Sequence, residues 1–216
     1  MLYPLFLKLR GRSVLVVGAG SVAVAKLRGL LGSGAQVTVV ATRANETVQA
    51  MAARGALVLY ERPFEEQDVA GRLLVVAATN DSEANARIRR CCQARGVLIN
   101  AVDDPDNCDF FVPAVVDRGA VQVAISTQGA SPALVRVLRE EIERVLHPTI
   151  GRYAELVASA RARIRAMVPE FEARRAANEA VVRSRARTLL EQGDEASALA
   201  EIEAVLEQLR NTEVKP

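Results

Sequence analysis

The sequence is constrained most by residues 13–31, SVLVVGAGSVAVAKLRGLL, which combine an apolar run, two closely spaced glycines and a helical pattern. Gly18 permits a sharp turn after a buried strand at 14–17, and Gly20 lets the backbone approach a pyrophosphate. Ala23 lets the helix pack closely on the strand, while the helix N-terminus offers free N–H groups to an anion. Because the glycines follow a strand and open a helix, the stretch favours a dinucleotide-binding turn over a purely structural one.

Strand and helix patterns alternate through the next eighty or so residues. The runs expected to be strands are 36–40, 57–60, 73–78 and 97–102, and those expected to be helices are 45–54, 65–70 and 82–95. The strand runs are apolar throughout, which is typical of parallel strands covered on both faces. Residues 2–9 are expected to be an edge strand or a lead-in. The pattern predicts an α/β domain with a parallel sheet in residues 1–112.

Polar residues follow these strands at the sheet edge where open α/β folds bind ligands. Thr42 and Arg43 follow the second strand, and Thr79 follows the fourth. An NAD site often has Asp or Glu at the end of the second strand to bind the ribose hydroxyls, but this chain has none there. Arg43 either faces the 2′-phosphate of NADP or lies in solvent. These features leave the choice between NAD and NADP open and favour NAD.

An acidic segment, Asp103 to Asp109, follows the fifth predicted strand and holds four carboxylates. Because Asp and Pro also form turns, most of these acids are expected only to shape the loop. Asp103 lies nearest the strand end and is the candidate general base. The segment lacks the ligand spacing and terminal Glu of an EF-hand, and no metal site is expected in the chain.

The architecture is expected to change after residue 112. Apolar segments at 110–116 and 121–125, joined by Asp117-Arg118-Gly119, have hairpin spacing. A small-residue loop at 126–132 then opens a helix, with Ser131 as its N-cap and proline in its first turn. This loop either binds an anion such as a substrate carboxylate or only caps the helix. His147 is expected to be a helix-end residue.

Residues 149–216 are expected to form a small all-helical domain. One apolar stripe runs from Tyr153 to Val168, a second helix follows Pro169 and runs to about Leu190, and a third follows Gly193. The apolar positions expected in the third helix are Leu199, Ile202, Val205 and Leu209. Arginines dominate the first part of this region and acids the second, which favours pairing between helices or a solvated face. Without interleaved aromatics, nucleic-acid binding is not expected.

Composition restricts the remaining choices. The formal net charge is +2, and the three cysteines, Cys91, Cys92 and Cys108, lack a repeated metal-ligand spacing, so reduced thiols are expected. No apolar run approaches the length of a membrane span, and the start, MLYPLFLKLRGRS, has no secretory pattern. We expect a cytoplasmic protein without a membrane segment.

Three segments resemble the precorrin-2 dehydrogenase family, the NAD-dependent part of sirohaem synthesis. They are LYPLFLKLRGRSVLVVGAGSVAVAKLRGLL, PFEEQDVAGRLLVVAATND and INAVDDPDNCDFFVPAVVDRGAVQVAISTQGASPALVRVLREEIE. The resemblance covers nearly the whole chain. It implies a Rossmann-like NAD-binding domain in residues 1–112, a dimerisation and active-site segment in 113–148, and a helical domain in 149–216. It also implies a homodimer whose active sites each lie near the other subunit.

The resemblance further implies that NAD+ takes a hydride from precorrin-2, which is oxidised to sirohydrochlorin while a base removes a proton. The family's catalytic aspartate falls on Asp103. The implied cofactor residues are Gly18, Gly20, Ser21, Val22, Thr42, Arg43 and Thr79, and the implied substrate residues are Ser126, Thr127, Gly129 and Ser131. The chain departs from the family at Ala25-Lys26, where relatives often carry Arg-Lys.

Three further hypotheses accompany this resemblance. The arginine-rich helices attract the carboxylates of the tetrapyrrole substrate, so charge reversal at Arg163 and Arg165 is expected to raise its KM. Some relatives also insert Fe2+, so a bifunctional dehydrogenase and sirohydrochlorin ferrochelatase is one alternative. A nucleotide-sensing regulator with the helical tail as output is another. An enzyme needs the loops at Asp103 and Ser126, whereas a sensor needs neither.

Overall fold

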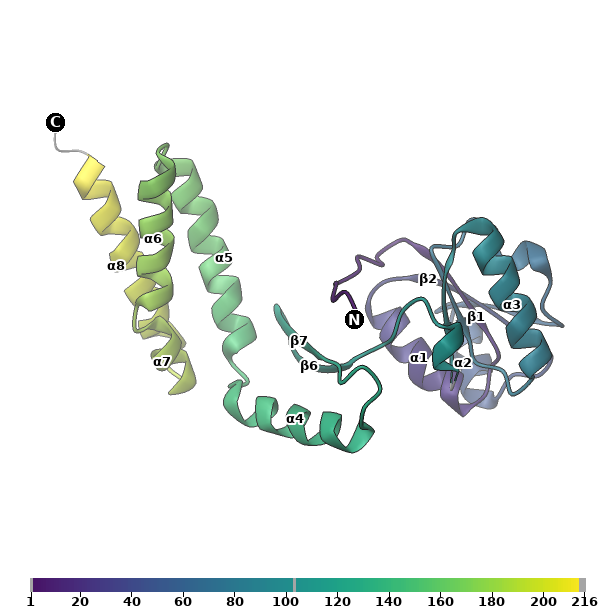
Figure 1. Cartoon of the computed structure of the whole chain (residues 1–216). Coiled ribbons are helices and arrows are strands. Elements are labelled where there is room, and N and C mark those ends of the chain that lie inside the picture. Colours follow the sequence, from purple (N-terminus) through teal and green to yellow (C-terminus); the bar gives the residue numbers. More distant parts are fainter. Residues whose placement is uncertain (1, 103, 214–216) are drawn as a thin grey trace. The chain divides into compact units, whose positions relative to one another are not determined.

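The chain folds into two compact units, Met1–Val112 and Pro113–Pro216. The computed structural model describes residues 2–102 and 104–213, with side chains as far as residue 210 (Figure 1). The candidate base, Asp103, therefore lies outside the described residues. Within these residues, no helix combines the length and apolar character that crossing a bilayer requires.

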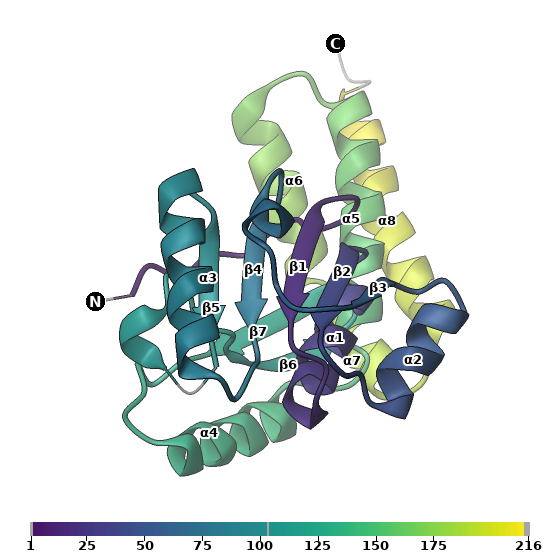
Figure 2. The ribbon, with the colours of Figure 1, turned by 90° about the vertical axis from the view of Figure 1, so that its right-hand side faces the viewer.

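The first unit is built on a five-stranded parallel sheet of order β3-β2-β1-β4-β5 (Figure 2), which confirms the predicted α/β fold. Its strands are β1 (Ser13–Val17), β2 (Gln36–Ala41), β3 (Val58–Glu61), β4 (Leu74–Ala77) and β5 (Leu98–Ala101). Its helices are α1 (Ser21–Gly32), α2 (Glu46–Ala53) and α3 (Ser82–Arg95), with short 3₁₀ turns η1 (Glu66–Val69) and η2 (Pro105–Asn107). The α-helices connect β1 to β2, β2 to β3 and β4 to β5, whereas η1 lies in the crossover from β3 to β4.

Alternate side chains of the central strand β1 enter two separate cores. Val14 and Val16 pack with α1 and α2 on one face of the sheet, whereas Leu15 and Val17 pack with α3 on the other. All four are buried. Covering both faces explains why the strand segments are apolar throughout and not alternating.

The structure decides between the two alternatives for the first residues and corrects one further expectation. Residues 2–8 form no strand: Pro4 cannot donate to a ladder, Tyr3, Leu5 and Phe6 are exposed, and only Leu9 packs on the core. The segment is thus a lead-in and not an edge strand. The short helix expected at 65–70 is the 3₁₀ turn η1.

The second unit begins with an antiparallel hairpin of β6 (Ala114–Arg118) and β7 (Val121–Ile125). The predicted hairpin is present, but its first strand starts four residues later than expected, and it includes Asp117 and Arg118. The chain turns at Gly119 and Ala120, where Gly119 adopts a φ of +72°. Phe110 packs instead on the core of the first unit.

Five helices follow the hairpin: α4 (Pro132–Val145), α5 (Ile150–Met167), α6 (Phe171–Arg183), α7 (Ala186–Glu191) and α8 (Glu195–Glu213). The helix expected to reach Leu190 is broken, because Ser184 is extended and its hydroxyl bonds Val181 O and Ala186 N. Of the apolar positions expected in α8, Ile202 is buried and Val205 and Leu209 pack against the core, whereas Leu199 is exposed; Ala198 and Leu206 are buried in addition. Side chains four residues apart thus meet the core formed by α5, α6 and α7.

Candidate functional site

The turn between β1 and α1 has no room for a side chain at its first glycine. Gly18 has a φ of +102°, and a Cβ placed there would lie 2.2 Å from the carbonyl oxygen of Ala78, at the end of β4. The Gly18 N–H also donates to Val40 O at 2.8 Å. The turn therefore lies directly between the ends of β2 and β4, which flank β1 in the sheet.

The second glycine of the turn is open. Gly20 is exposed, and among the described residues no atom would lie within 4 Å of a Cβ added to it. It is the N-cap of α1, and no side chain caps this helix end in the described structure. Uncapped N–H groups beside free space suit a phosphate group, because they stabilise negative charge through directed hydrogen bonds and the helix dipole. The turn thus fits the pyrophosphate of a dinucleotide.

The other expected cofactor residues lie at the same edge of the sheet. Thr42 and Arg43 follow β2 and are exposed, and Thr79 follows β4. The N–H of Asn45, in the connection after β2, donates to Ala19 O at 3.2 Å and joins that connection to the glycine turn. Because the strands are parallel, three connections at one edge carry Gly18, Gly20, Ser21, Val22, Thr42, Arg43 and Thr79.

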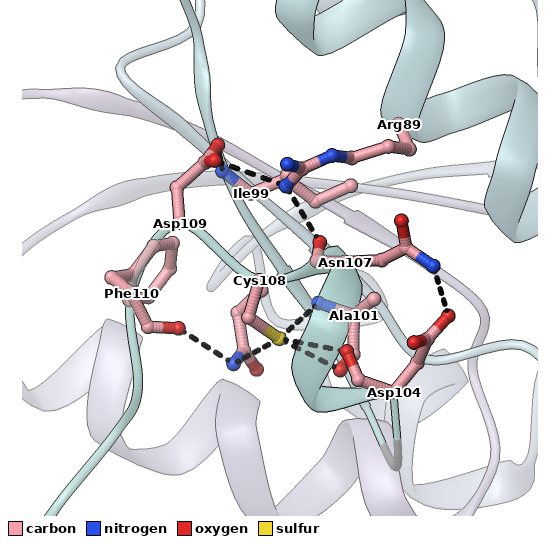
Figure 3. Close-up of polar contacts among 9 residues, drawn as sticks. Arg89, Ile99, Ala101, Asp104, Asn107, Cys108, Asp109 and Phe110 are labelled. Atoms are coloured by element: carbon pink, nitrogen blue, oxygen red, sulfur yellow. Dashed lines mark hydrogen bonds and ion pairs between the residues drawn. The ribbon is translucent and has the colours of Figure 1, made fainter.

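The loop after β5, which carries the position of Asp103, is closed at its base by a thiol (Figure 3). The Sγ of Cys108 accepts from Ala101 N at 3.2 Å and lies within hydrogen-bond distance of the carbonyl oxygens of Ala101 and Asp104. The buried amide of Asn100 donates to Phe110 O at 3.0 Å and contacts the same sulfur at 3.4 Å. These contacts hold the two ends of the loop together.

The end of this loop is held against β5 by hydrogen bonds, and an ion pair joins it to α3 (Figure 3). Asp109 exchanges hydrogen bonds with Ile99: its N–H donates to Ile99 O, and its Oδ2 accepts from Ile99 N. Its Oδ1 pairs with Arg89 of α3 at 3.0 Å, and Arg89 also donates to Asn107 O. Asp104 accepts from the Asn107 side chain at 2.7 Å. Asp104 and Asp109 thus shape the loop, as the sequence predicted.

The thiols near this loop are protonated at neutral pH. Burial raises the pKa of the Cys92 thiol to about 12, and burial likewise raises the pKa of Cys108. Cys91, Cys92 and Cys108 are all free. Across the described parts of the chain, no three His, Cys, Asp or Glu side chains are grouped so that they hold a metal ion.

The second unit contains the expected substrate loop, where hydroxyl groups bind the backbone locally. Ser126 Oγ accepts from Gln128 N, Thr127 Oγ1 from Ser131 N, and Ser131 Oγ from Leu134 N. The last contact confirms Ser131 as the N-cap of α4. Gln128 and Gly129 both have positive φ, at +54° and +86°. Each of the three hydroxyls uses a lone pair in these contacts, which leaves its hydrogen available to an oxygen of a ligand.

The arginine-rich helices use part of their charge in pairs with α8. Arg163 forms a two-pronged ion pair with Glu203, and Arg152 contacts Glu195 at 2.7 Å and Glu155 at 2.9 Å. The arginine-rich and acid-rich parts of this region predicted pairing between helices, and these ion pairs confirm it. The hypothesis treated Arg163 and Arg165 alike. Both are exposed, but Arg163 pairs with Glu203, whereas Arg165 forms no ion pair with a residue that the structure describes. His147 lies at the helix end, with Nδ1 2.8 Å from Thr149 Oγ1.

Helix α4 leaves its apolar face largely uncovered within a single chain. None of its side chains is buried, and Leu134 and Val137 are each almost half exposed. Val115 of the hairpin is also exposed. An uncovered apolar face of this kind is typical of a surface that contacts another protein.

Three family models match consecutive parts of the chain. The model described as "Putative NAD(P)-binding" matches residues 5–114, "Sirohaem biosynthesis protein central" matches 118–144, and "Sirohaem synthase dimerisation region" matches 149–206. The first model covers the parallel sheet and its glycine turn. The second covers the second strand of the hairpin, the substrate loop and nearly all of α4. The third falls on the helices from α5 onward.

Similar proteins carry related names. A siroheme synthase of Methylococcus capsulatus is 46% identical over 172 residues, which are 80% of this chain and 36% of that protein. One of Thioalkalivibrio sulfidiphilus is 38% identical over 205 residues, 95% of this chain and 42% of that protein. The chain thus spans about two fifths of the length of these relatives.

A solved structure, "SirC, precorrin-2 dehydrogenase", matches with a TM-score of 0.76 and 25% identity, covering 97% of this chain and all of that one. Its match extends over both units. The glycine turn, the three consecutive family models and this structural match agree with one another. The chain belongs to the family of NAD(P)-binding proteins of sirohaem biosynthesis, with the central and dimerisation regions that follow the NAD(P)-binding domain in that family.

Proposed function

We propose that this chain is an NAD-dependent precorrin-2 dehydrogenase. In the reaction, precorrin-2 and NAD+ give sirohydrochlorin, NADH and a proton. The observation that carries the proposal is the glycine turn, open at Gly20 and closed against Ala78 at Gly18, within a fold that matches a precorrin-2 dehydrogenase over its whole length. When bound, NAD+ supplies the hydride acceptor for this oxidation.

The first unit binds the dinucleotide at the carboxyl edge of its sheet. The N–H groups at the start of α1, in Ser21 and Val22, hold the pyrophosphate beside Gly18 and Gly20. Thr42 and Arg43 lie on the adenosine side, where the connection after β2 has no carboxylate to bind the ribose hydroxyls or to repel a 2′-phosphate. NAD is the proposed cofactor, and a comparison of NAD+ with NADP+ tests this choice.

Asp103 is the proposed general base. It follows Val102, whose N–H donates to Ala77 O at 2.9 Å, and it precedes Asp104, whose carbonyl is near the Cys108 thiol. The chain on both sides of the base is therefore fixed to the sheet. This supports the assignment, because general-base catalysis depends on precise placement of the group that removes the proton.

The loop at 126–131 is the proposed substrate site. Ser126, Thr127 and Ser131 present hydroxyl hydrogens, and Gly129 keeps a side chain out of the loop. Carboxylates on the periphery of a tetrapyrrole accept such hydrogen bonds. The uncovered apolar face of α4 supports a homodimer, in which a second copy covers this face.

Replacing Asp103 by asparagine is expected to reduce kcat at least about 100-fold, because the amide cannot accept the proton. Turnover of precorrin-2 is measured anaerobically with NAD+ or NADP+, with and without Fe2+. The matched control is Asp106→Asn, an exposed carboxylate in the same loop, which is expected to retain turnover. Normal turnover by Asp103→Asn removes the base assignment. Iron-dependent loss of sirohydrochlorin would indicate the second activity, ferrochelation.

Charge reversal at Arg165 is expected to raise the KM for precorrin-2 several-fold and to leave the KM for NAD+ unchanged. Arg165, unlike Arg163, forms no ion pair with a described residue, so its charge is free to attract carboxylates. Arg54→Glu changes the net charge equally on the NAD-binding unit and serves as the control. If both variants change the KM for precorrin-2 alike, or neither does, Arg165 has no specific role. Arg163→Glu is expected instead to lower the free energy of unfolding, because the introduced glutamate lies opposite Glu203.

A further inference from the structure

The connection between β4 and α3 forms a wall of the glycine turn. Strands β1 and β4 are neighbours in the sheet (Figure 2). The atoms nearest to a Cβ on Gly18 are Ala78 O at 2.2 Å, Ala78 C at 2.7 Å and Thr79 N at 3.2 Å. The position of the Ala78–Thr79 peptide therefore determines the width of the space beside Gly18. Any change in this connection alters the surface that a bound dinucleotide meets.

One side chain holds this connection at two points. Asn85 Oδ1 accepts from the Thr79 hydroxyl at 2.6 Å, and Asn85 Nδ2 donates to Thr79 O at 3.2 Å. The Thr79 hydroxyl in turn accepts from Asp81 N at 3.2 Å. Asn85 lies in the first turns of α3, where its own N–H donates to Asp81 O, and it is half-buried. Backbone and side chain of Thr79 are thus both bound to one rigid helix.

These contacts change the expected role of Thr79. Its hydroxyl has one hydrogen, which it donates to Asn85, and it accepts from Asp81 N. The hydroxyl is therefore used in holding the connection. The part of Thr79 that lies beside the glycine turn is its backbone, whose nitrogen is 3.2 Å from a Cβ placed on Gly18.

We propose that Asn85 is a positioning residue for dinucleotide binding: it holds the Thr79 peptide against the glycine turn and keeps the cofactor crevice in its binding shape. This inference rests on the proposed NAD-binding function. An asparagine is suited to the task because it both accepts from the hydroxyl and donates to the carbonyl of the same residue. Aspartate retains only the first of these contacts at neutral pH, and alanine retains neither.

The test compares NAD+ affinity, measured by titration calorimetry on the full-length protein, for wild type and two variants. Asn85→Ala is expected to weaken NAD+ binding about 10-fold, as the loss of two modest hydrogen bonds predicts. Its kcat at saturating NAD+ and its KM for precorrin-2 are expected to stay near those of wild type. Asn178→Ala, which removes a half-buried asparagine hydrogen-bonded to Arg174 O in α6, is the control for a general loss of stability.

Asn85→Asp supplies a readout that a purely structural role does not move. At pH 8 its carboxylate faces the Thr79 carbonyl oxygen, and the repulsion is expected to weaken binding at least as much as alanine does. Because aspartate is nearly isosteric with asparagine, this loss reports the missing contact with the Thr79 carbonyl and not a cavity.

The outcomes separate the inference from the function on which it rests. If wild type binds NAD+ and Asn85→Ala binds it equally well, the positioning role is overturned. If Asn85→Ala and Asn178→Ala lose affinity alike, the effect is one of stability and the role is also overturned. If wild type itself does not bind NAD+, the proposed function fails and this inference fails with it. Selective loss of NAD+ affinity in Asn85→Ala and Asn85→Asp, with kcat at saturating NAD+ and the KM for precorrin-2 near those of wild type, supports it.

Discussion

Alanine in place of Gly18 is expected to abolish measurable NAD+ binding and to lower the free energy of unfolding by on the order of 3 kcal/mol. The added Cβ lies 2.2 Å from Ala78 O, and the φ of +102° is unfavourable for any residue with a side chain. To relieve the overlap, β1 and β4 must separate where the dinucleotide is proposed to bind. Calorimetric NAD+ titration and thermal unfolding of the same preparation measure the two losses.

Gly20→Ala is the matched control, because its Cβ enters open space at an ordinary φ of −83°. This variant is expected to unfold like wild type and to bind NAD+ more weakly, since the methyl group occupies the space proposed for the pyrophosphate. The comparison separates the two glycines: one is needed for the fold and the site, the other for the site alone. Undiminished NAD+ binding by both variants would contradict the placement of the dinucleotide at this turn.

Gly151→Ala is expected to have the largest effect in the second unit, a loss of at least about 3 kcal/mol in its unfolding free energy. A Cβ on this buried glycine lies 1.7 Å from the carbonyl oxygen of Arg118, at the end of β6. The same arginine donates to Glu143 O and Leu146 O at the end of α4. Moving the hairpin away from α5 therefore also disturbs the end of α4.

Denaturant unfolding followed by circular dichroism measures this loss, and size-exclusion chromatography reports whether the proposed dimer persists. Gly29→Ala is the control, because Gly29 lies in helix α1 with open space around its Cβ. That substitution is expected to raise stability by about 1 kcal/mol, as alanine is the better helix former. Equal stability of Gly151→Ala and wild type would show that the hairpin is not packed on α5 as described.

Local patterns in the sequence predicted much of the first unit. The apolar runs identified the parallel strands, because Val14 and Leu15 enter opposite cores and both faces must be apolar. The glycine turn was recognisable because the fold needs a residue without a side chain at Gly18. The N-cap at Ser131 followed from a similarly local rule, since its hydroxyl bonds an N–H three residues away.

Contacts between distant residues were beyond these patterns. Arg72 donates to the hydroxyls of Ser13 and Thr38, which lie on two different strands, and no spacing rule connects them. In α8, the side chains that meet the other helices are fixed by packing, so Leu206 is buried and Leu199 is not. Such contacts exist only after the chain has folded, whereas a turn or cap depends on neighbours in sequence.

In the candidate site, too, the features that follow from local sequence were predictable, and the contacts between distant residues were not. The residues of the glycine turn and the strand ends were predictable because ligands bind at the carboxyl edge of a parallel sheet. The residues that support them were missed: Asn85 holds Thr79, and Asn100 and Cys108 close the loop after β5. One signal for Asn100 was available, since a lone amide within the apolar run VLINAV has to find a partner when buried.

The central claim is that this chain transfers a hydride from precorrin-2 to NAD+, and one anaerobic reaction tests it most directly. Purified wild-type protein is mixed with precorrin-2 and NAD+, and NADH fluorescence is recorded together with the absorbance of sirohydrochlorin. We predict that NADH and sirohydrochlorin appear together in equal amounts, and that neither appears without NAD+. Folded protein that forms no NADH from precorrin-2, or that forms sirohydrochlorin without it, would contradict the claim.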